Sequence, residues 1–526
     1  MHEVMSDPKD VADGVAEMSL SQRKKMEKMK KIQEQKAAKQ AAKAAAAAAT
    51  PTQAGTKQAN EVPALVLDTS LPPATEVRVV DVHKHTGQRV KVFAWVQYVR
   101  DQGSLVFLDL RDGSGAVPPV LQCVLTGKLA KTAEARQLLR ETAVEIFGTV
   151  VSDERAPHGV ELKADYWNVV GPSDPELEER FNESSHPDVL LDQRFLHIRS
   201  VRFSSILRLR SITTAAFREF FYSRDFSEVT PPTLVQTEAS NVTDRSSAEL
   251  RRVFQVEGGA DLFTVNYFGE DAYLTQSSQL YLETVIPSLG NAFCIMPSYR
   301  AEKSRTRRHL SEFTHVEGEM AFYTFEKLLQ FVEDMVVTVS QIVVDKAGPL
   351  LYSVNPDFKP PKGPFLRMKY SEAIAWLNEH NVPNEETKQP WKIGDGISEA
   401  PERHMNDEIG QPILLYGFPA DQKPFYMSRA DFDNNMTESV DLLMPGVGEI
   451  VGGSMREWDL QRLKDAYAAK NLDPTPYGWY NDLRKFGTCP HGGFGLGLER
   501  FLCWILKLDH IREVSLYPRF VGRCSP

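Results

Sequence analysis

Between residues 89 and 170 the chain consists mainly of five short β-patterned runs, and this pattern restricts the fold more than any other part of the sequence. Alternating apolar and polar residues, rich in β-branched and aromatic types, are typical of strands with one buried face. Turns with Gly or Asp separate the runs, and one helical stretch is expected near 129–141. Five strands of this length can close a small barrel. The runs cover residues 89–96, 104–113, 120–125, 143–151 and 160–170.

A closed five-stranded barrel fits an OB-fold, whose exposed strands and loops often bind single-stranded nucleic acid. Phe107, with Arg100 nearby, is the pair that could stack on a base. An aromatic residue in a strand is more often part of a core, so spacing alone leaves both interpretations of Phe107 open.

The part of the chain after the barrel predicts a mixed α+β fold with a large, mostly antiparallel sheet. A connector rich in Pro and acidic residues occupies 171–193, and a helical period begins near Ile206. The helix leads into a strand-like segment that Pro231 and Pro232 interrupt. β-rich runs and helices alternate from there onward.

The formal charge of −10 argues against a nucleic-acid partner, but it hides a strong asymmetry. Residues 21–43 hold nine basic and two acidic residues, a local charge of +7 that leaves −17 for the remaining chain. This stretch contains good helix formers and no Gly or Pro before Pro51, so it predicts a basic helix. Either it is a solvated tail, or it is an arm that holds phosphates without reading base sequence.

The sequence also allows predictions about the cellular compartment and about the cysteines. No apolar run approaches the ~18 residues that span a bilayer. Residues 1–20 carry acids where a targeting peptide would carry arginine or a long apolar stretch, so we expect a cytoplasmic protein without a membrane partner. The five cysteines lie far apart with no C-x-x-C pair, so neither a zinc site nor a disulfide framework is expected.

One segment, 299–313, places four arginines and a histidine within ten residues. Arginine suits phosphate because its planar fork makes two parallel charge-assisted hydrogen bonds, and Phe313 offers a ring to a purine. A solvated basic loop is the alternative.

A second segment, 491–500, is rich in glycine, which allows a ligand to approach the backbone closely, and it leads into a helix at Arg500. Its spacing is neither a Walker loop nor G-x-G-x-x-G. Between the two segments, Asp441 and 448–456 supply carboxylates and an arginine, and such oxygen ligands suit Mg²⁺ on phosphates.

In this order the segments resemble the class II aminoacyl-tRNA synthetases of the aspartate, asparagine and lysine subgroup, from about residue 77 to the C-terminus. Motifs 1, 2 and 3 correspond to about 206–232, 299–317 and 492–506. The resemblance implies an antiparallel-sheet catalytic domain preceded by an OB-fold barrel and a basic, partly helical extension. The implied divisions are 1–75 for the extension and linker, 76–172 for the anticodon-binding barrel, 173–205 for a hinge and 206–526 for the catalytic domain.

The resemblance implies ATP and Mg²⁺ as ligands and gives each residue a role. Arg300 would contact the amino-acid carboxylate and the α-phosphate, and Arg500 the γ-phosphate, so these two are the expected catalytic residues. Glu449 would bind Mg²⁺, although Gly452 stands where related aspartyl enzymes have a serine. Glu302 would meet the adenine amino group, and Phe313 would stack on the ring. The full expected ATP set is Arg300, Glu302, Arg308, His309, Leu310, Phe313, Glu449, Gly497 and Arg500.

The reaction that the resemblance implies forms an aminoacyl-adenylate and pyrophosphate, then acylates the 3′-OH of a tRNA. No dedicated general base is needed, because the substrate carboxylate is already a nucleophile. Motif 1 implies a homodimer.

The amino acid is predicted from 274–283. Related aspartyl enzymes have a Lys-Gln pair where this chain has Leu282 and Glu283. Losing a cation and gaining an anion disfavours a second carboxylate, whereas glutamate can accept a hydrogen bond from an amide. We therefore expect L-asparagine and tRNA(Asn); for Glu283 a helix-surface carboxylate is the alternative. The expected asparagine-binding set is Glu257, Gln279, Glu283, Arg300 and Arg456.

For the anticodon, the resemblance implies that Phe107 stacks on the central uridine, Gln122 contacts a base edge and Arg100 contacts the backbone. Residues 238–254 look like an insertion that either forms a surface excursion or modulates the substrate loop. Three other functions stay open from sequence: an aspartyl-tRNA synthetase, a synthetase-like enzyme that releases free asparagine, and a tRNA-binding relative without ligase activity.

Overall fold

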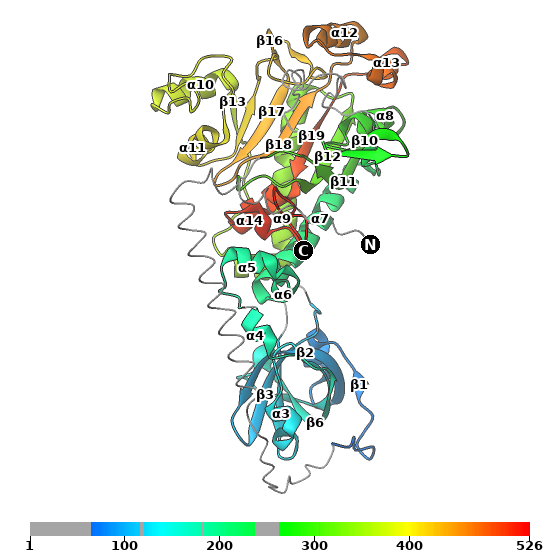
Figure 1. Cartoon of the computed structure of the whole chain (residues 1–526), viewed down its shortest axis with the longest axis vertical. Coiled ribbons are helices and arrows are strands. Elements are labelled where there is room, and N and C mark those ends of the chain that lie inside the picture. Colours follow the sequence, from blue (N-terminus) through cyan, green and yellow to red (C-terminus); the bar gives the residue numbers. More distant parts are fainter. Residues whose placement is uncertain (1–64, 116–119, 181, 237–261, 304–305) are drawn as a thin grey trace, which may run out of the picture. The chain divides into compact units, whose positions relative to one another are not determined.

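The computed structural model describes residues 65–115, 120–180, 182–236, 262–303 and 306–526 (Figure 1). The basic segment 21–43, the expected insertion 238–254 and Glu257 lie outside the described residues.

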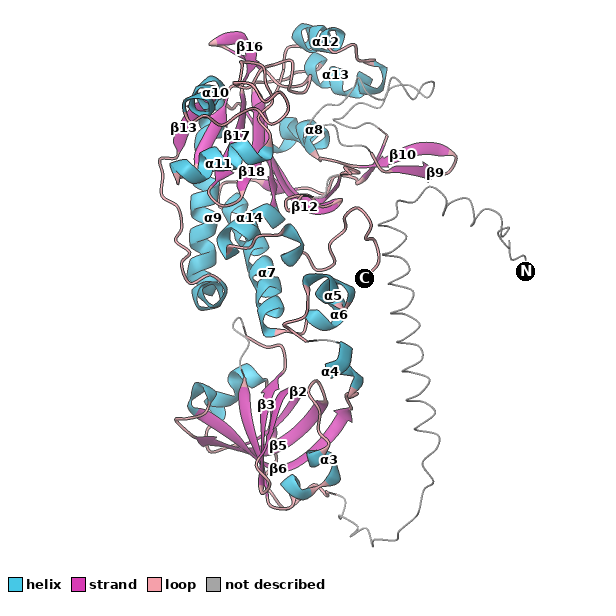
Figure 2. Cartoon of the chain, turned by 60° about the vertical axis from the view of Figure 1, so that its left-hand side comes forward, coloured by secondary structure: helices cyan, strands magenta, loops and turns pink. Residues whose placement is uncertain are grey.

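The first described domain is a closed β-barrel (Figure 2). Its strands follow the order β1-β2-β3-β4-β6-β5, and an additional pairing between β2 and β5 closes the sheet. Buried and partly exposed residues alternate along β3 and β5, as the sequence pattern requires for strands around a core. The five predicted strands correspond to β2–β6, β1 is an additional strand of two residues, and the predicted OB-fold is confirmed. The bounds are β1 Thr75–Glu76, β2 Arg89–Asp101, β3 Leu105–Arg111, β4 Leu121–Thr126, β5 Ala143–Ser152 and β6 Val160–Gly171.

The helix predicted near 129–141 is shorter than expected. A 3-10 turn at Leu129–Lys131 is followed by α3, Ala133–Arg136. Thr132 separates them because its backbone is extended, and its side chain accepts a hydrogen bond from the Ala135 amide, which starts the second element anew. Two further 3-10 elements flank the strands, at Val79–His85 and Pro157–Gly159.

After the barrel, the connector contains three short helices: α4 Glu176–Arg180, α5 Pro187–Asp192 and α6 Arg194–His197. The long helix α7, Val201–Tyr222, begins before the predicted start at Ile206. Ser200 sets this start because its side chain accepts a hydrogen bond from the Phe203 amide.

An eight-stranded sheet forms the centre of the second domain, in the order β13-β14-β17-β18-β19-β12-β11-β7. Neighbours are antiparallel except for the β13–β14 and β11–β7 pairs, so the predicted mostly antiparallel sheet is confirmed. The strands are β7 Ser227–Glu228, β11 Asn291–Tyr299, β12 Glu312–Ala321, β13 Leu366–Lys369, β14 Ile413–Tyr416, β17 Ser439–Met444, β18 Gly448–Met455 and β19 His491–Gly497. Two small sheets comprise β8 Leu234–Val235, β9 Thr264–Tyr267 and β10 Glu270–Leu274, and β15 Arg429–Ala430 and β16 Asp433–Thr437.

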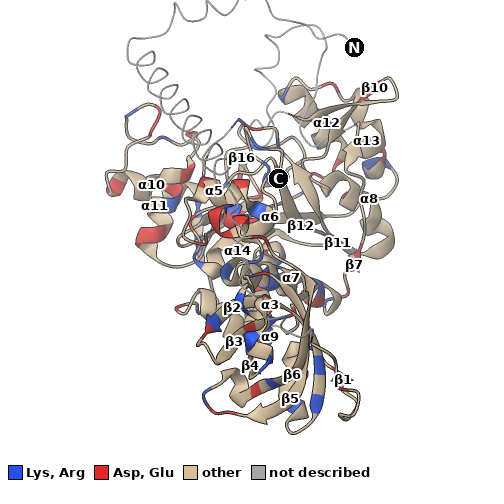
Figure 3. Ribbon diagram, turned by 60° about the horizontal axis from the view of Figure 1, so that its bottom comes forward, with Lys and Arg blue, Asp and Glu red and all other residues tan. Residues whose placement is uncertain are grey.

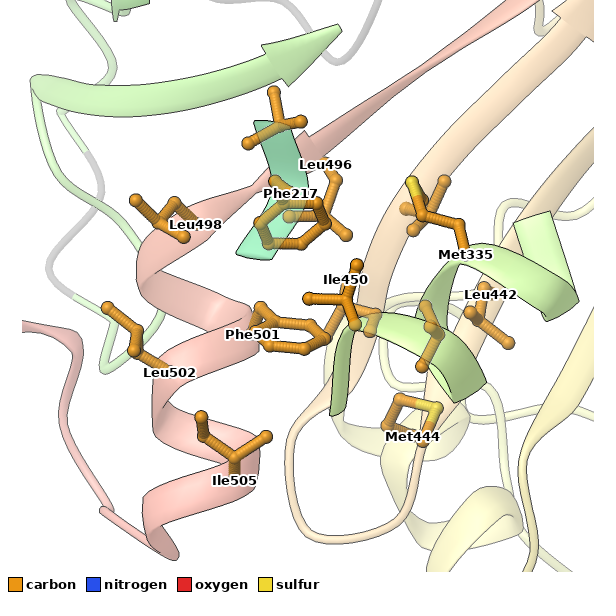
Figure 4. Close-up of a cluster of buried hydrophobic side chains, with 14 of the residues drawn as sticks. Phe217, Met335, Leu442, Met444, Ile450, Leu496, Leu498, Phe501, Leu502 and Ile505 are labelled. Atoms are coloured by element: carbon orange, nitrogen blue, oxygen red, sulfur yellow. The ribbon is translucent and has the colours of Figure 1, made fainter. Parts of the chain in front are cut away.

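The main core lies where α7, α9 and α14 pack on this sheet (Figure 2). Figure 4 shows Phe217, Ile450 and Phe501 pointing into it. The ring of Phe221 stacks on Phe293 with centroids 4.3 Å apart, which joins α7 to β11. The remaining helices are α8 Gln279–Leu289, α9 Phe325–Val354, α10 Tyr370–Glu379, α11 Glu399–Ile409, α12 Leu460–Ala469, α13 Gly478–Lys485 and α14 Leu498–Leu506, with 3-10 turns at Thr475–Tyr477 and Ile511–Glu513.

Within the described residues, no helix combines the length and the apolar character needed to cross a bilayer. All five cysteines are free thiols.

Candidate active site

A cavity of about 450 Å³ lies against the large sheet, and most of the predicted ATP and asparagine residues line it. They come from β12, β18 and the residue after it, β19, α8, α14 and the segment that joins β11 to β12. Glu302, Glu283 and Glu257 are the exceptions: the first two do not line the cavity, and Glu257 lies outside the described residues. The lining residues that the sequence predicted are Gln279, Arg300, Arg308, His309, Leu310, Phe313, Glu449, Arg456, Gly497 and Arg500.

Arg300 follows directly after β11. Its amide donates to the Ser311 carbonyl at 3.0 Å, which closes the base of the connecting segment and directs the side chain to the cavity. The guanidinium carbon lies 5.3 Å from the centroid of the Phe313 ring. Among the residues that the structure describes, no side chain or carbonyl accepts a hydrogen bond from this guanidinium, so its donors face the cavity available to an anionic ligand.

Arg308 and Arg500 converge on Glu449 from different elements. Arg500 Nη1 donates to a Glu449 carboxylate oxygen at 3.0 Å and to its carbonyl at 3.1 Å. Arg308 Nη2 donates to the same carbonyl at 3.0 Å. Burial alone would raise the pKa of Glu449, but Arg500 and then Arg308 hold it at about 2, so this carboxylate is ionised at neutral pH.

Asp441 lies beside Glu449 across the β17–β18 pair, in register with Gly452. A Cβ atom added at Gly452 would lie 3.6 Å from an oxygen of each carboxylate. The glycine therefore occupies the place from which a serine would join both acids. Two carboxylates on one side of the cavity form a donor set that Mg²⁺ prefers.

The glycines of β19 make room for functional side chains. A Cβ at Gly493 would lie 2.0 Å from a Glu319 oxygen, and one at Gly495 would lie 2.3 Å from His315 Nε2. Phe494 and Leu496, which alternate with them, are buried in the core on the other face. The glycine-rich pattern thus lets β12 side chains lie over β19.

We expect Gly493→Ala to lower the free energy of unfolding by about 1–3 kcal/mol, because the new methyl would also meet the Gly318 carbonyl oxygen at 2.3 Å, which cannot rotate away. Urea denaturation measures the change. Gly478→Ala is the matched control, since its Cβ would meet open space and its φ is negative. Equal stabilities for the two variants would contradict the packing described.

Behind the cavity wall lies a buried ion cluster. Arg456 donates through Nε and Nη2 to the two oxygens of Glu319 at 3.1 and 3.0 Å. Glu283 is also buried, so the alternative of a helix-surface carboxylate is wrong. Its oxygens accept from Arg484 Nη2 at 2.6 Å and from the Tyr480 hydroxyl at 2.8 Å. A direct contact between Glu283 and a substrate amide stays a prediction, because its nearest donors here are protein groups.

Several cavity-lining residues were not among the predicted site residues, notably His315, Glu317, Glu319 and Glu402. The first three occupy alternate positions of β12, so they share one face of a central strand. A polar face on a strand of the core was the signal that could have found them. Burial, followed by the nearby Glu449 carboxylate, raises the pKa of Glu402 to about 8. No local pattern marks that residue.

The three predicted anticodon residues lie on neighbouring strands of the barrel. Arg100 is in register with Phe107 across β2 and β3, with its guanidinium 5.8 Å from the ring centroid. Arg100 Nη2 also donates to Gln122 Oε1 at 3.0 Å. Phe107 is partly exposed rather than core. Acidic residues as well as basic ones lie on the strands of the barrel (Figure 3), and Arg100 forms an ion pair with Asp109 at 2.9 Å.

Both the barrel and the domain with the large sheet match families of known proteins. Residues 186–521 match the family described as tRNA synthetases class II (D, K and N), and residues 90–170 match the OB-fold nucleic acid binding domain. The cytoplasmic asparagine–tRNA ligase of Bos taurus is 51% identical over 465 residues, which cover 87% of this chain and 79% of that protein.

Two solved structures are similar along most of this chain. Entamoeba histolytica asparaginyl-tRNA synthetase in complex with asparaginyl-adenylate has a TM-score of 0.78 and 43% identity, covering 87% of this chain and all of that one. The Pyrococcus horikoshii enzyme complexed with asparaginyl-adenylate has a TM-score of 0.77 and 35% identity, covering 86% of this chain and all of that one. This chain belongs to the class II tRNA synthetases of the D, K and N group.

Proposed function

We propose that the chain is an asparagine–tRNA ligase that activates L-asparagine with ATP and transfers it to tRNA(Asn). The observation that carries the proposal is the cavity in which Arg300, Arg308 and Arg500 converge beside the buried Arg456–Glu319 pair. Relatives that are named cytoplasmic asparagine–tRNA ligases, and structures that are described with asparaginyl-adenylate, support the same substrate and a cytoplasmic location.

In the first step, an oxygen of the asparagine carboxylate attacks the α-phosphorus of ATP. The new O–P bond forms as the bond to the bridging oxygen of the β-phosphate breaks, and pyrophosphate leaves with its electron pair. Arg300 binds both the carboxylate and the α-phosphate, which offsets the repulsion between two anions and stabilises charge in the transition state. No proton needs to be removed from the nucleophile.

Arg308 and Arg500 bind the outer phosphates, where a negative charge develops on the leaving group. In the structure both guanidinium groups meet at Glu449, so they are already oriented toward one point. Mg²⁺, when bound, neutralises phosphate charge, and Glu449 and Asp441 are the residues that would hold it. Phe313 offers the adenine a ring to stack on.

In the second step, the terminal 3′-OH of tRNA attacks the carbonyl carbon of asparaginyl-adenylate. The new C–O ester bond forms as the bond between the carbonyl carbon and the phosphate oxygen breaks; AMP leaves with that electron pair, and the hydroxyl proton passes to solvent. Recognition of the anticodon falls to the barrel, where Arg100, Phe107 and Gln122 form one surface over three strands.

We expect Phe107→Ala to raise the KM for tRNA about 5- to 150-fold, because stacking of one base on an aromatic ring contributes about 1–3 kcal/mol. Pyrophosphate exchange, which needs no tRNA, stays unchanged. Steady-state aminoacylation and exchange assays on the same protein separate the two. The exposed Phe93→Ala, on β2 of the same barrel, controls for general loss of surface aromatics. If the Phe107 variant matched the parent in KM for tRNA, that residue would not stack on the anticodon.

We expect Gly452→Ser to lower the Mg²⁺ concentration that gives half-maximal exchange by about 2- to 10-fold. The added hydroxyl has room, and it supplies an oxygen beside Glu449 and Asp441. Gly452→Ala adds the same carbon without the oxygen and is the control. A Mg²⁺ requirement that both variants share with the parent would argue against this pair of carboxylates as the metal site.

A homodimer through motif 1 is part of the proposal. The two-residue strand β7 lies at the edge of the large sheet, next to β11. Exposed apolar side chains flank this edge: Tyr222 at the end of α7, Leu289 at the end of α8 and Phe322 after β12. An unprotected sheet edge with apolar neighbours favours pairing with a second copy. Sedimentation equilibrium tests this, and a monomer at micromolar concentration would refute it.

The whole proposal is tested by charging total tRNA with asparagine, aspartate or lysine and identifying the acylated species. We expect tRNA(Asn) with asparagine alone. Charging with aspartate would favour an aspartyl enzyme. Release of free asparagine, or no charging of any tRNA, would favour the other two functions that the sequence left open.

A further inference from the structure

The carboxylate of Glu283 is the centre of a hydrogen-bond cluster directly behind the cavity. Side chains of both Glu283 and Arg484 are 1% exposed, so this ion pair is fully removed from water. Four side chains supply the donors around the two oxygens: Gln279 Nε2 at 3.2 Å, the Tyr480 hydroxyl at 2.8 and 2.9 Å, Arg484 Nη2 at 2.6 Å and His491 Nε2 at 3.0 Å.

Two of these donors come from α13, about 200 residues further along the chain. Tyr480 and Arg484 are one helical turn apart, so they share a face of the helix. Arg484 Nη2 also donates to the Tyr480 oxygen at 2.8 Å, and Arg484 Nε donates to the Glu457 carbonyl at 3.1 Å. The guanidinium is therefore fixed on one side by the backbone and on the other by Glu283.

The Arg456–Glu319 pair lies next to this cluster. Oxygens of Glu283 and Glu319 and a nitrogen of His491 lie within 4.8 Å of one another. Such a group could hold a metal ion, but both carboxylates already accept hydrogen bonds from guanidinium groups. The arrangement is therefore a compact ion cluster of two acids, two arginines and a histidine.

Three members of the cluster also form part of the cavity wall. Gln279, Glu319 and Arg456 line the cavity and belong to the cluster. Burial alone would raise the pKa of Glu283, but Arg484 and then His491 hold it well below its usual range. The wall of the cavity is thus backed by a carboxylate that stays ionised within the cluster, and this acceptor disfavours a substrate side chain that carries a second carboxylate.

We propose that Arg484 and Tyr480 are positioning residues for amino-acid choice: they hold Glu283 as a fixed anion behind the wall of Gln279, Glu319 and Arg456. Neither touches the substrate. Their role rests on the proposed function, since it concerns the choice between asparagine and aspartate. Without Arg484, burial raises the pKa of Glu283, and once this carboxyl is protonated the cavity loses the ionised acceptor that disfavours aspartate.

The experiment measures kcat/KM for asparagine and aspartate in pyrophosphate exchange, and the KM for ATP, between about pH 6 and 9. In Arg484→Gln we expect kcat/KM for asparagine to rise with pH over this range, whereas in the parent it does not. The reason is that a raised pKa leaves Glu283 protonated at the acidic end. At the acidic end, the preference for asparagine over aspartate falls at least about 10-fold and then recovers as the pH rises. The KM for ATP stays within about twofold.

Three further variants complete the test. Arg484→Lys keeps a cation at this position, so it restores the parental pH profile. Lys485→Gln removes the exposed neighbouring cation of α13 and changes nothing. Tyr480→Phe removes one hydrogen bond to a charged group without changing charge, and it lowers kcat/KM for asparagine about 5- to 20-fold at an unchanged KM for ATP. This last variant tests the inference even if Arg484→Gln does not fold.

A parental pH profile and an unchanged preference in folded Arg484→Gln would overturn the inference, as would an unchanged kcat/KM for asparagine in Tyr480→Phe. A KM for ATP that worsens by the same factor as kcat/KM for asparagine would also overturn the inference, because that result indicates only a structural role. The proposed function fails separately, if the parent protein shows no exchange with asparagine.

Discussion

Arg300→Gln is expected to lower the rate of asparagine-dependent pyrophosphate exchange by about 10²–10³-fold. The guanidinium is the group that we place on both the carboxylate and the α-phosphate, and removing one preorganised donor from a developing charge has an effect of this size. Within the described residues it donates no side-chain hydrogen bond and contacts the Phe313 ring, so the free energy of unfolding falls by no more than about 1 kcal/mol. Exchange kinetics and urea denaturation on one preparation measure both quantities.

The matched control is Arg307→Gln, which removes an exposed arginine side chain of the same segment. The Arg307 backbone carbonyl accepts a hydrogen bond from the Ile511 amide, and the substitution keeps that bond. We expect it to retain exchange within a few-fold of the parent. If Arg300→Gln did the same, the electrostatic mechanism described for adenylate formation would be wrong.

Arg456→Gln is expected to have the largest effect on stability, about 3–5 kcal/mol, because it leaves Glu319 buried without its counter-ion. It should also abolish asparagine activation, since Arg456 lines the cavity. The double variant Arg456→Met, Glu319→Leu removes both charges and recovers much of the stability, but it does not recover exchange. A double variant as unstable as Arg456→Gln would contradict the ion-pair explanation.

The instability of Arg456→Gln should depend on pH in a defined direction. Burial already raises the pKa of Glu319 in the parent, against the opposing effect of Arg456. Without that guanidinium the folded-state pKa rises further above the unfolded value, so the folded state binds the proton more tightly. The stability that proton binding by Glu319 contributes to the variant is then present at low pH and lost as the pH rises. Urea denaturation at pH 5 and pH 8 should therefore show the larger loss of stability at pH 8.

Much of the fold and of the ATP site could be predicted because the signals are local. The barrel strands follow from alternation over a few residues, and the β11–β12 hairpin follows from strand-like runs on both sides of an arginine-rich segment. Glycines at 493 and 495 mark close approach by other side chains, although the pattern does not say which ones. Helix starts were missed where a single side chain, such as that of Ser200 or Thr132, sets the first turn.

The ion cluster behind the cavity could not be predicted, because its members are brought together only by the tertiary fold. Glu283 was identified from the sequence, but its environment was not: the two residues that bind it most tightly are about 200 positions away. In the sequence, Tyr480 and Arg484 have the spacing of an ordinary amphipathic helix, in which an arginine usually faces water.

The central claim is tested most directly by ATP–pyrophosphate exchange with purified protein and one amino acid at a time. We predict exchange that depends on asparagine, with aspartate and lysine lower by about 10³- to 10⁴-fold at equal concentration. Comparable exchange with aspartate, or none with asparagine, would contradict the account.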